Sequence, residues 1–171
     1  MTSSPRKTLV VASSKTGNTL IVAHAVADAY AEGVLVTPRT APEDLSSYDT
    51  VLLGFWCDRG NAPEEMLAFA RRLEQKKIGC FATMGGNPQD ERAQAWMAKT
   101  SAALSGLGKD NTLSATFLCR GRIDPALFDM MTKMAGGTVS AEREARRRES
   151  ETHPDRLDCL AAVAAMAPLF N

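Results

Sequence analysis

The chain has 171 residues, of which 44% are hydrophobic, 23% charged and only 6% aromatic, a composition typical of a globular protein. Twenty basic residues balance twenty acidic ones, so the chain lacks the excess positive charge of most nucleic-acid-binding proteins. No apolar run approaches the roughly 20 residues of a membrane-spanning helix, and the N-terminal segment is too short and too polar for a signal peptide. We therefore expect residues 1–171 to form a single cytoplasmic domain that binds neither nucleic acid nor membrane.

The cysteines and histidines do not form a metal-binding pattern. The four cysteines are widely spaced, no CxxC motif is present, and His24 and His153 are the only histidines. We therefore expect no structural zinc and no disulfide framework, but reduced thiols. The cysteines are Cys57, Cys80, Cys119 and Cys159.

Short apolar runs alternate with helical patterns through the first two thirds of the chain. Short apolar runs predict strands at 9–12, 34–36, 50–55 and 78–83, and an imperfect alternation of apolar residues predicts a fifth strand at 112–119. Apolar residues at helical spacing predict helices at 19–32, from Pro63 to the pair Lys76 and Lys77, and at 89–105. Such alternation is typical of βαβ units, and it predicts the α/β class with a three-layer, doubly wound sheet.

The last third of the chain is more polar. We expect a short helix at 124–134, a break at Gly136 and Gly137, and a charged, solvated helix at 140–151. A final Ala-rich helix is predicted to begin at His153-Pro154-Asp155 and to end near residue 170.

The loop after the first strand contains the strongest functional signal. Backbone N–H groups at the start of a helix bind anions, and this loop adds hydroxyl and amide groups that suit a phosphate. It lacks both GxxxxGK[ST] and GxGxxG, which disfavours nucleoside triphosphate and dinucleotide sites. The alternative is that Thr16 or Asn18 merely caps the helix while Gly17 makes a turn. The loop residues are Ser13, Ser14, Lys15, Thr16, Gly17, Asn18 and Thr19.

Residues 14–19 resemble the [ST]-x-T-G-x-T phosphate-binding loop of the flavodoxin family. The run from Tyr48 to Gly54 is similar to the family's approach to its third strand, and the spacing of the later loops agrees. The resemblance implies a flavodoxin-like fold with five parallel strands in the order 2-1-3-4-5. It also implies non-covalent binding of FMN, with the phosphate in the first loop and without a cationic clamp.

In the family the flavin ring lies between the loops after the third and fourth strands. Here the first of these loops contributes Phe55, Trp56, Cys57, Asp58, Arg59, Gly60 and Asn61, and the second contributes Thr83, Met84, Gly85, Gly86 and Asn87. Trp56 offers a flat apolar face for stacking on the ring, although it could also be a packing residue. The resemblance implies that Gly60 lets a backbone carbonyl of this loop turn toward flavin N5, and that backbone N–H groups of residues 58–61 face the ring.

Glycines in the second loop allow a close backbone approach to the ring, with a plain turn as the alternative. The second loop lacks the tyrosine that usually stacks on the flavin in the family. We therefore expect either that Met84 covers one face of the ring or that this face stays open. Ordinary flavodoxins are also acidic, whereas this chain is neutral and places Arg59 beside the expected ring. A cation there is expected to raise the reduction potential. Cys57 is either a redox thiol or, without a neighbouring cysteine, an inert one.

Two further regions have alternative interpretations. Arg120 and Arg122 follow the fifth strand and could contact FMN or a partner, or form a solvated loop. The methionines Met130, Met131 and Met134 could form a docking surface, or belong to the core.

A wider pattern covers several loops: Phe55-Trp56-x-Asp58-x-Gly60, Cys119-x-Gly121 and His153-Pro154. It is similar to a branch of short flavodoxin-like proteins, some described as companions of bilirubin reductase.

These observations favour an FMN-binding electron carrier between a reductase and an acceptor enzyme, acting as a monomer or weak homodimer. The first alternative is an NAD(P)H-dependent FMN or quinone reductase on the same fold. The second is an interaction module without a cofactor.

Overall fold

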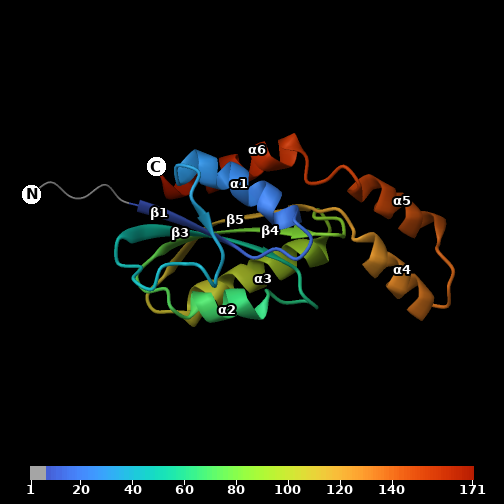
Figure 1. The fold of residues 1–171 in the computed structure, drawn as a ribbon, viewed down its shortest axis with the longest axis horizontal. Helices are drawn as coiled ribbons and strands as arrows, with labels where there is room; N and C mark the ends of the chain where they lie inside the picture. The colour runs from blue at the N-terminus through green and yellow to red at the C-terminus, as the bar shows by residue number, and fades with distance from the viewer. Residues whose placement is uncertain (1–6) are drawn as a thin grey trace, which may run out of the picture.

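The computed structural model describes residues 7–171 and contains one five-stranded parallel sheet with the order β2-β1-β3-β4-β5 (Figure 1). This order confirms the predicted doubly wound α/β fold. The expectation about a signal peptide lies partly outside the described residues. The strands are β1 (Lys7–Ala12), β2 (Leu35–Val36), β3 (Tyr48–Trp56), β4 (Lys77–Met84) and β5 (Thr112–Arg120).

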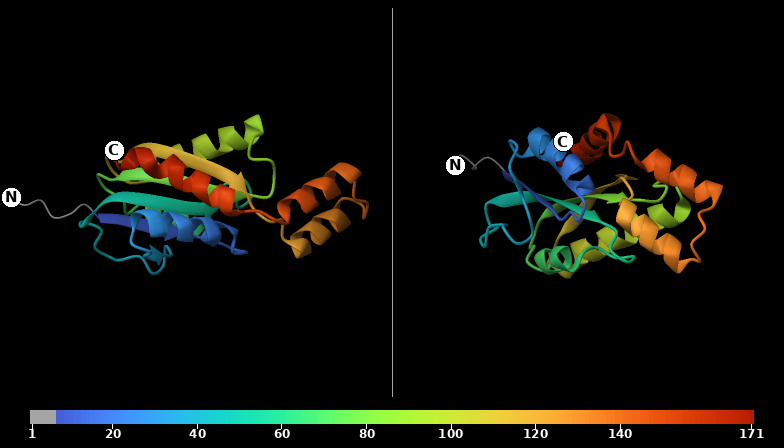
Figure 2. Two further views of the ribbon diagram at one scale, coloured as in Figure 1. Left: turned by 90° about the horizontal axis from the view of Figure 1, so that it is seen from above. Right: turned by 45° about the vertical axis from the view of Figure 1, so that its right-hand side comes forward.

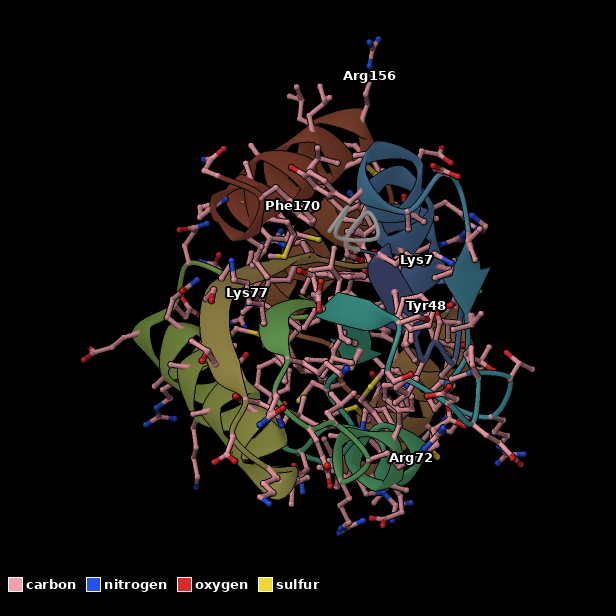
Figure 3. All side chains as sticks on the ribbon, turned by 90° about the vertical axis from the view of Figure 1, so that its left-hand side faces the viewer. Lys7, Tyr48, Arg72, Lys77, Arg156 and Phe170 are labelled. Atoms are coloured by element: carbon pink, nitrogen blue, oxygen red, sulfur yellow. The ribbon has the colours of Figure 1, made fainter. Side chains whose placement is uncertain are left out.

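Four helices cover the two faces of the sheet (Figures 1 and 2). One face packs against α1 (Asn18–Tyr30) and α6 (Arg156–Met166), which continues into a 3₁₀ turn at Ala167–Leu169. The other face packs against α2 (Glu64–Ala70) and α3 (Glu91–Leu107). Figure 3 shows these three layers from the end of the sheet where Lys7, Tyr48 and Lys77 begin their strands. The carboxyl ends of the strands, where ligands bind in such sheets, lie at the opposite end.

Burial on both faces explains why β1, β3 and β4 are nearly continuous apolar runs, whereas β5 at the edge of the sheet alternates between exposed and half-buried residues over most of its length. The side chains from Val51 to Leu53 and Phe55 are fully buried in β3, as is Phe81 in β4. Gly54 pairs with Phe81, and a Cβ atom at Gly54 would lie only 2.4 Å from the Phe81 ring. The large ring therefore fits because the neighbouring strand has no side chain there.

Most predicted boundaries differ from the structure by one or two residues, and one differs by more. The second helix ends at Ala70 and not at Lys76 and Lys77, because Lys77 already pairs with Thr50 in the sheet. The Lys76 ammonium group donates hydrogen bonds to the backbone carbonyls of Leu45, before β3, and of Tyr48, the first residue of β3, so this lysine anchors the start of that strand. Trp56 and Met84 are the last residues of β3 and β4, whereas the sequence placed them in loops.

A helical hairpin, α4 (Pro125–Met134) and α5 (Ala141–Ser150), separates β5 from α6. It lies beyond the carboxyl ends of the strands instead of covering a face of the sheet (Figure 2). The side chains of Asp124 and Ser140 cap the two helices, and the turn between them has positive φ angles at Gly136 and Gly137. Within residues 7–171, no helix combines the length and apolar character needed to cross a membrane.

Candidate ligand-binding site

A cavity of about 450 Å³ opens at the carboxyl ends of the strands, between the sheet and α4. This size falls in the range of small-molecule sites. One part of its lining is polar and consists of Ser14, Lys15, Thr16, Asn18, Thr19 and Thr83. Another part is apolar and consists of Trp56, Met84, Ile123, Ala126, Leu127 and Met130. The remaining lining residues are Cys57, Gly85, Arg122 and Asp124.

The polar part is built on the first turn of α1. Gly17 is the N-cap residue, with a φ of 95° that favours glycine, and no side chain of the described residues caps the helix. This excludes the alternative in which Thr16 or Asn18 is the cap. The Ser14 hydroxyl accepts a hydrogen bond from the Gly17 N–H (3.0 Å), which fixes the loop. The N-terminal turn of α1 is therefore open to an anion from outside the helix.

Asn18 and Thr19 connect this loop to its neighbours. The Asn18 amide donates to the backbone carbonyl of Arg122 (2.9 Å), and the Thr19 and Thr83 hydroxyls share a buried hydrogen bond (2.9 Å). A Cβ atom at Gly121 would lie 2.7 Å from the Asn18 side chain, so only glycine allows this close contact. The hydroxyls of Ser14 and Thr16 thus remain the polar groups best suited to reach a ligand.

Ser13 lies behind the loop and does not line the cavity. Its side chain is buried and its hydroxyl donates to the Glu65 carboxylate (2.5 Å). Its backbone N–H donates to the carbonyl of Gly54, so Ser13 extends the pairing of β1 with β3 and positions the loop.

Trp56 and Cys57 line the cavity at the end of β3, whereas Phe55 does not. Phe55 is fully buried in the core and meets Trp96 edge to face. The Lys15 ammonium lies 5.5 Å from the Trp56 ring centroid, a cation–π contact inside the cavity.

Burial is the main cause that raises the pKa of the Cys57 thiol above its usual range. A backbone hydrogen bond from Gly60 opposes this effect, and the charge of Asp58 adds to it. A thiol that stays protonated at neutral pH is a poor nucleophile, which supports the inert alternative for Cys57.

Residues 58–61 form a tight turn outside the cavity lining. Asp58 and Asn61 exchange two backbone hydrogen bonds of 2.8 and 2.9 Å, and Arg59 and Gly60 have positive φ angles. The Gly60 carbonyl accepts a hydrogen bond from the Trp96 indole (3.1 Å), so it is already engaged on the α3 side. The cations that line the cavity are Lys15 and Arg122, not Arg59.

Only part of the second predicted loop reaches the cavity. Met84 and Gly85 line it, whereas Gly86 and Asn87 do not. The Asn87 amide donates to the carboxylate of Asp90, the N-cap residue of α3. A Cβ atom at Gly85 would lie 3.0 Å from Ile123, so this glycine allows a close approach between the β4 and β5 connections.

Sequence reasoning missed the α4 side of the cavity. Ile123, Asp124, Ala126 and Leu127 line it together with Met130, which the sequence had indicated only as a surface or core methionine. The helical spacing of apolar residues in α4 was visible in the sequence, but the position of the helix beyond the sheet was not.

Arg120, a possible contact residue, and His153, which was expected to form no metal site, are both engaged by neighbouring side chains. Arg120 forms an ion pair with Glu149 of α5 (2.5 Å) and is not part of the cavity lining. His153 interacts through Nδ1 with Asp158 (2.6 Å). Although ligand-type atoms of His153, Asp155 and Asp158 lie within 4.8 Å of one another, the two aspartates form the capping box of α6, which accounts for their proximity.

Comparison with known proteins supports the resemblance to flavodoxins along most of the chain. The sequence profile of the flavodoxin domain matches residues 9–167. The flavodoxin-like domain-containing protein BilS of Clostridioides difficile (strain CD3) is 28% identical over 157 residues, which cover 87% of this chain and 88% of that protein.

Solved structures share the fold at low sequence identity. A WrbA-like flavodoxin from Agrobacterium tumefaciens has a TM-score of 0.52 and 15% identity, covering 94% of this chain and 99% of its own. An azoreductase from Bacillus anthracis str. Sterne has a TM-score of 0.51 and 12% identity, covering 93% and 99%. The profile match, together with the strand order and the loop after β1, shows that this chain belongs to the flavodoxin family, whose members generally bind flavin, typically FMN.

Proposed function

We propose that this protein binds FMN non-covalently in the cavity and carries electrons between a reductase and an acceptor enzyme. The observation that carries the proposal is the two-part lining of the cavity. A helix N-terminus without a side-chain cap lies at one part, and a largely apolar surface that includes Trp56 lies at the other. FMN has the same two-part character, with a phosphate and a flat ring system.

The polar part fits a phosphate in several ways. The N-terminal turn of α1 supplies backbone N–H donors and the positive end of the helix dipole. The hydroxyls of Ser14 and Thr16 can donate additional hydrogen bonds to phosphate oxygens. No cation is required at this end, although Lys15 adds a positive charge nearby.

The apolar part fits the ring. Trp56 provides a large flat surface, and Met84 extends the apolar lining from the neighbouring strand. Burying the ring there removes water from it, which strengthens the effect of nearby charges on its reduction potential. Lys15 and Arg122 are the cations that line this cavity, and they favour the more negatively charged form of a bound redox group.

Bound FMN supplies the redox chemistry, because it can take up and release electrons one or two at a time. The protein's residues hold the ring, fix its orientation and adjust its potential. The proposed transfer therefore needs no side chain that acts as an acid or a base.

A spectroscopic titration tests the proposal. The purified protein is mixed with increasing FMN, and the visible absorption and fluorescence of the flavin are followed. We expect a saturable spectral change with one FMN per chain. If no change appears, the FMN-binding proposal is wrong and the interaction module without a cofactor becomes the better hypothesis.

Turnover distinguishes a carrier from an enzyme. The FMN-loaded protein is expected to oxidise NADH or NADPH slowly when alone, and to be reduced rapidly once a flavodoxin reductase and NADPH are added. Rapid oxidation by the protein alone would contradict the carrier proposal and favour the NAD(P)H-dependent reductase.

A further inference from the structure

The helix α4 has an apolar face that the protein itself does not cover. Leu127, Met130, Met131 and Met134 follow the spacing i, i+3, i+4 and i+7, which places them on one side of the helix. Their exposed fractions are 45%, 52%, 52% and 81%. A surface helix normally buries such a stripe, and in α4 the one buried residue is Thr132.

Contacts with α5 hold α4 in this orientation. The guanidinium groups of Arg143 and Arg147 lie 5.4 and 5.9 Å from the Phe128 ring centroid. At the base of the hairpin, the Ser150 hydroxyl accepts a hydrogen bond from the Ile123 N–H (3.1 Å). These contacts use Phe128 and Ile123, the residue before the N-cap of α4, and they leave the apolar stripe free.

The stripe divides at the edge of the cavity. Leu127 and Met130 line the cavity, whereas Met131 and Met134, further along the same stripe, do not. The first two residues therefore present half-exposed apolar surface to the interior of a ligand site. Burial of that surface by a ligand is favourable in proportion to the apolar area removed from water.

We propose that Leu127 and Met130 of α4 form a second wall of the ring site and pack against the flavin that Trp56 contacts from the strand ends. This inference rests on the proposed function, because it assigns residues for the ring of the same FMN. It also assigns side chains that can cover the second face of the ring, since residues 84–88 contain no aromatic residue to do so. Flexible apolar side chains, methionine above all, adapt well to a flat ring.

Flavin binding by matched variants tests the proposal. The double variant Leu127→Ala/Met130→Ala removes the apolar wall, and Met131→Ala/Met134→Ala removes a similar amount of apolar side chain from the same stripe outside the cavity. Each protein is titrated with FMN and with riboflavin, which has the ring but no phosphate, and fluorescence gives the dissociation constants.

We expect the first variant to raise both dissociation constants at least tenfold, or about 1.4 kcal/mol, and the second to change them less than twofold. Thermal melts check that both variants stay folded, as the exposure of all four side chains leads us to expect.

The possible failures are distinguishable. If the unaltered protein binds neither flavin, the proposed function fails and the inference falls with it. If it binds FMN but the Leu127/Met130 variant binds equally well, only the inference is wrong. Equal weakening by both variants, or weakening for FMN but not riboflavin, would also overturn it, because the effect would then not come from ring contacts inside the cavity.

Discussion

The strand side and the hairpin side of the cavity are held in place by different interactions. Trp56 and Met84 extend from strands whose side chains are almost completely buried, and the sheet is covered on both faces. The α4–α5 hairpin instead depends on helix caps, ion pairs and cation–π contacts near the surface. Within α5, hydrogen bonds from Arg147 and Arg148 lower the pKa of Glu144 to about 2.

This difference implies a division of roles. Apolar burial of the size found in the sheet contributes most of the folding free energy of a domain, whereas exposed ion pairs contribute little. The strand side therefore provides a rigid platform. Substitutions on the hairpin side are therefore expected to lower the free energy of unfolding less.

The largest expected effect is on the strand side. Phe81 is fully buried beneath Gly54, so Phe81→Ala should lower the free energy of unfolding by about 3–5 kcal/mol. Met134→Ala on the hairpin should change it by less than about 0.5 kcal/mol. Urea denaturation measures both. Similar losses in the two variants would contradict the division between platform and hairpin.

The next effect concerns the polar part of the cavity. Thr16→Val should weaken FMN binding by about 1.5–3 kcal/mol, because it removes a hydrogen bond to a charged phosphate. Riboflavin binding should not change. Thr112→Val serves as the control in the same titrations, because Thr112 begins β5, at the end of the strand away from the cavity. A loss that is equal for FMN and riboflavin would place Thr16 away from the phosphate.

A pH experiment examines the strand side through Cys57. Because burial raises the pKa of this thiol, its thiolate fraction at pH 7 is small, so alkylation by iodoacetamide should be slow and should rise roughly tenfold per pH unit. The Cys159→Ser variant leaves Cys57 as the one partly exposed cysteine of residues 7–171. Mass spectrometry follows the modification.

Two additions sharpen that experiment. Asp58→Asn should speed the reaction, since the Asp58 charge raises the pKa of Cys57. Bound FMN should slow it, since Cys57 lines the cavity. A rapid, pH-independent reaction would show that Cys57 is an activated thiol instead.

The smallest effect should come from the ion pair that joins the hairpin to the sheet. Glu149→Gln removes the partner of Arg120 and should cost about 0.2–1 kcal/mol. Hydrogen exchange should become faster in α4 and α5, while exchange in β3 stays the same. A change that extends through the sheet would mean that the hairpin and the platform unfold together.

The sheet could be predicted because its sequence signals are local. Continuous apolar runs mark strands that are buried on both faces, and the loop at residues 13–19 has its pattern within one segment. The end of α2 could not be predicted in this way. Lys76 looks like a helix terminator, but its role is to bind carbonyls of residues 45 and 48, far away in the sequence.

The cavity shows the same contrast between local sequence signals and contacts made far along the chain. Its strand side follows from where strands end, and the residues predicted there include Trp56, Cys57 and Met84. The turn at 58–61 was expected to face the ligand. Instead it lies outside the cavity lining, and its Gly60 carbonyl accepts a hydrogen bond from the indole of Trp96 in α3. The contribution of α4 depends on the direction in which the hairpin leaves β5. A hydrogen bond between Ile123 and Ser150 holds the two ends of the hairpin together, and no short sequence motif predicts it.

The hydrogen bond between Ile123 and Ser150 also has a practical meaning for protein engineering. The chain enters and leaves the hairpin at nearly the same point, since Ile123 and Ser150 are within hydrogen-bonding distance. A segment whose two ends meet can be exchanged or shortened without stretching the rest of the chain. We therefore expect that the residues between them can be replaced as a unit, so that one wall of the site can be redesigned while the sheet is left unchanged.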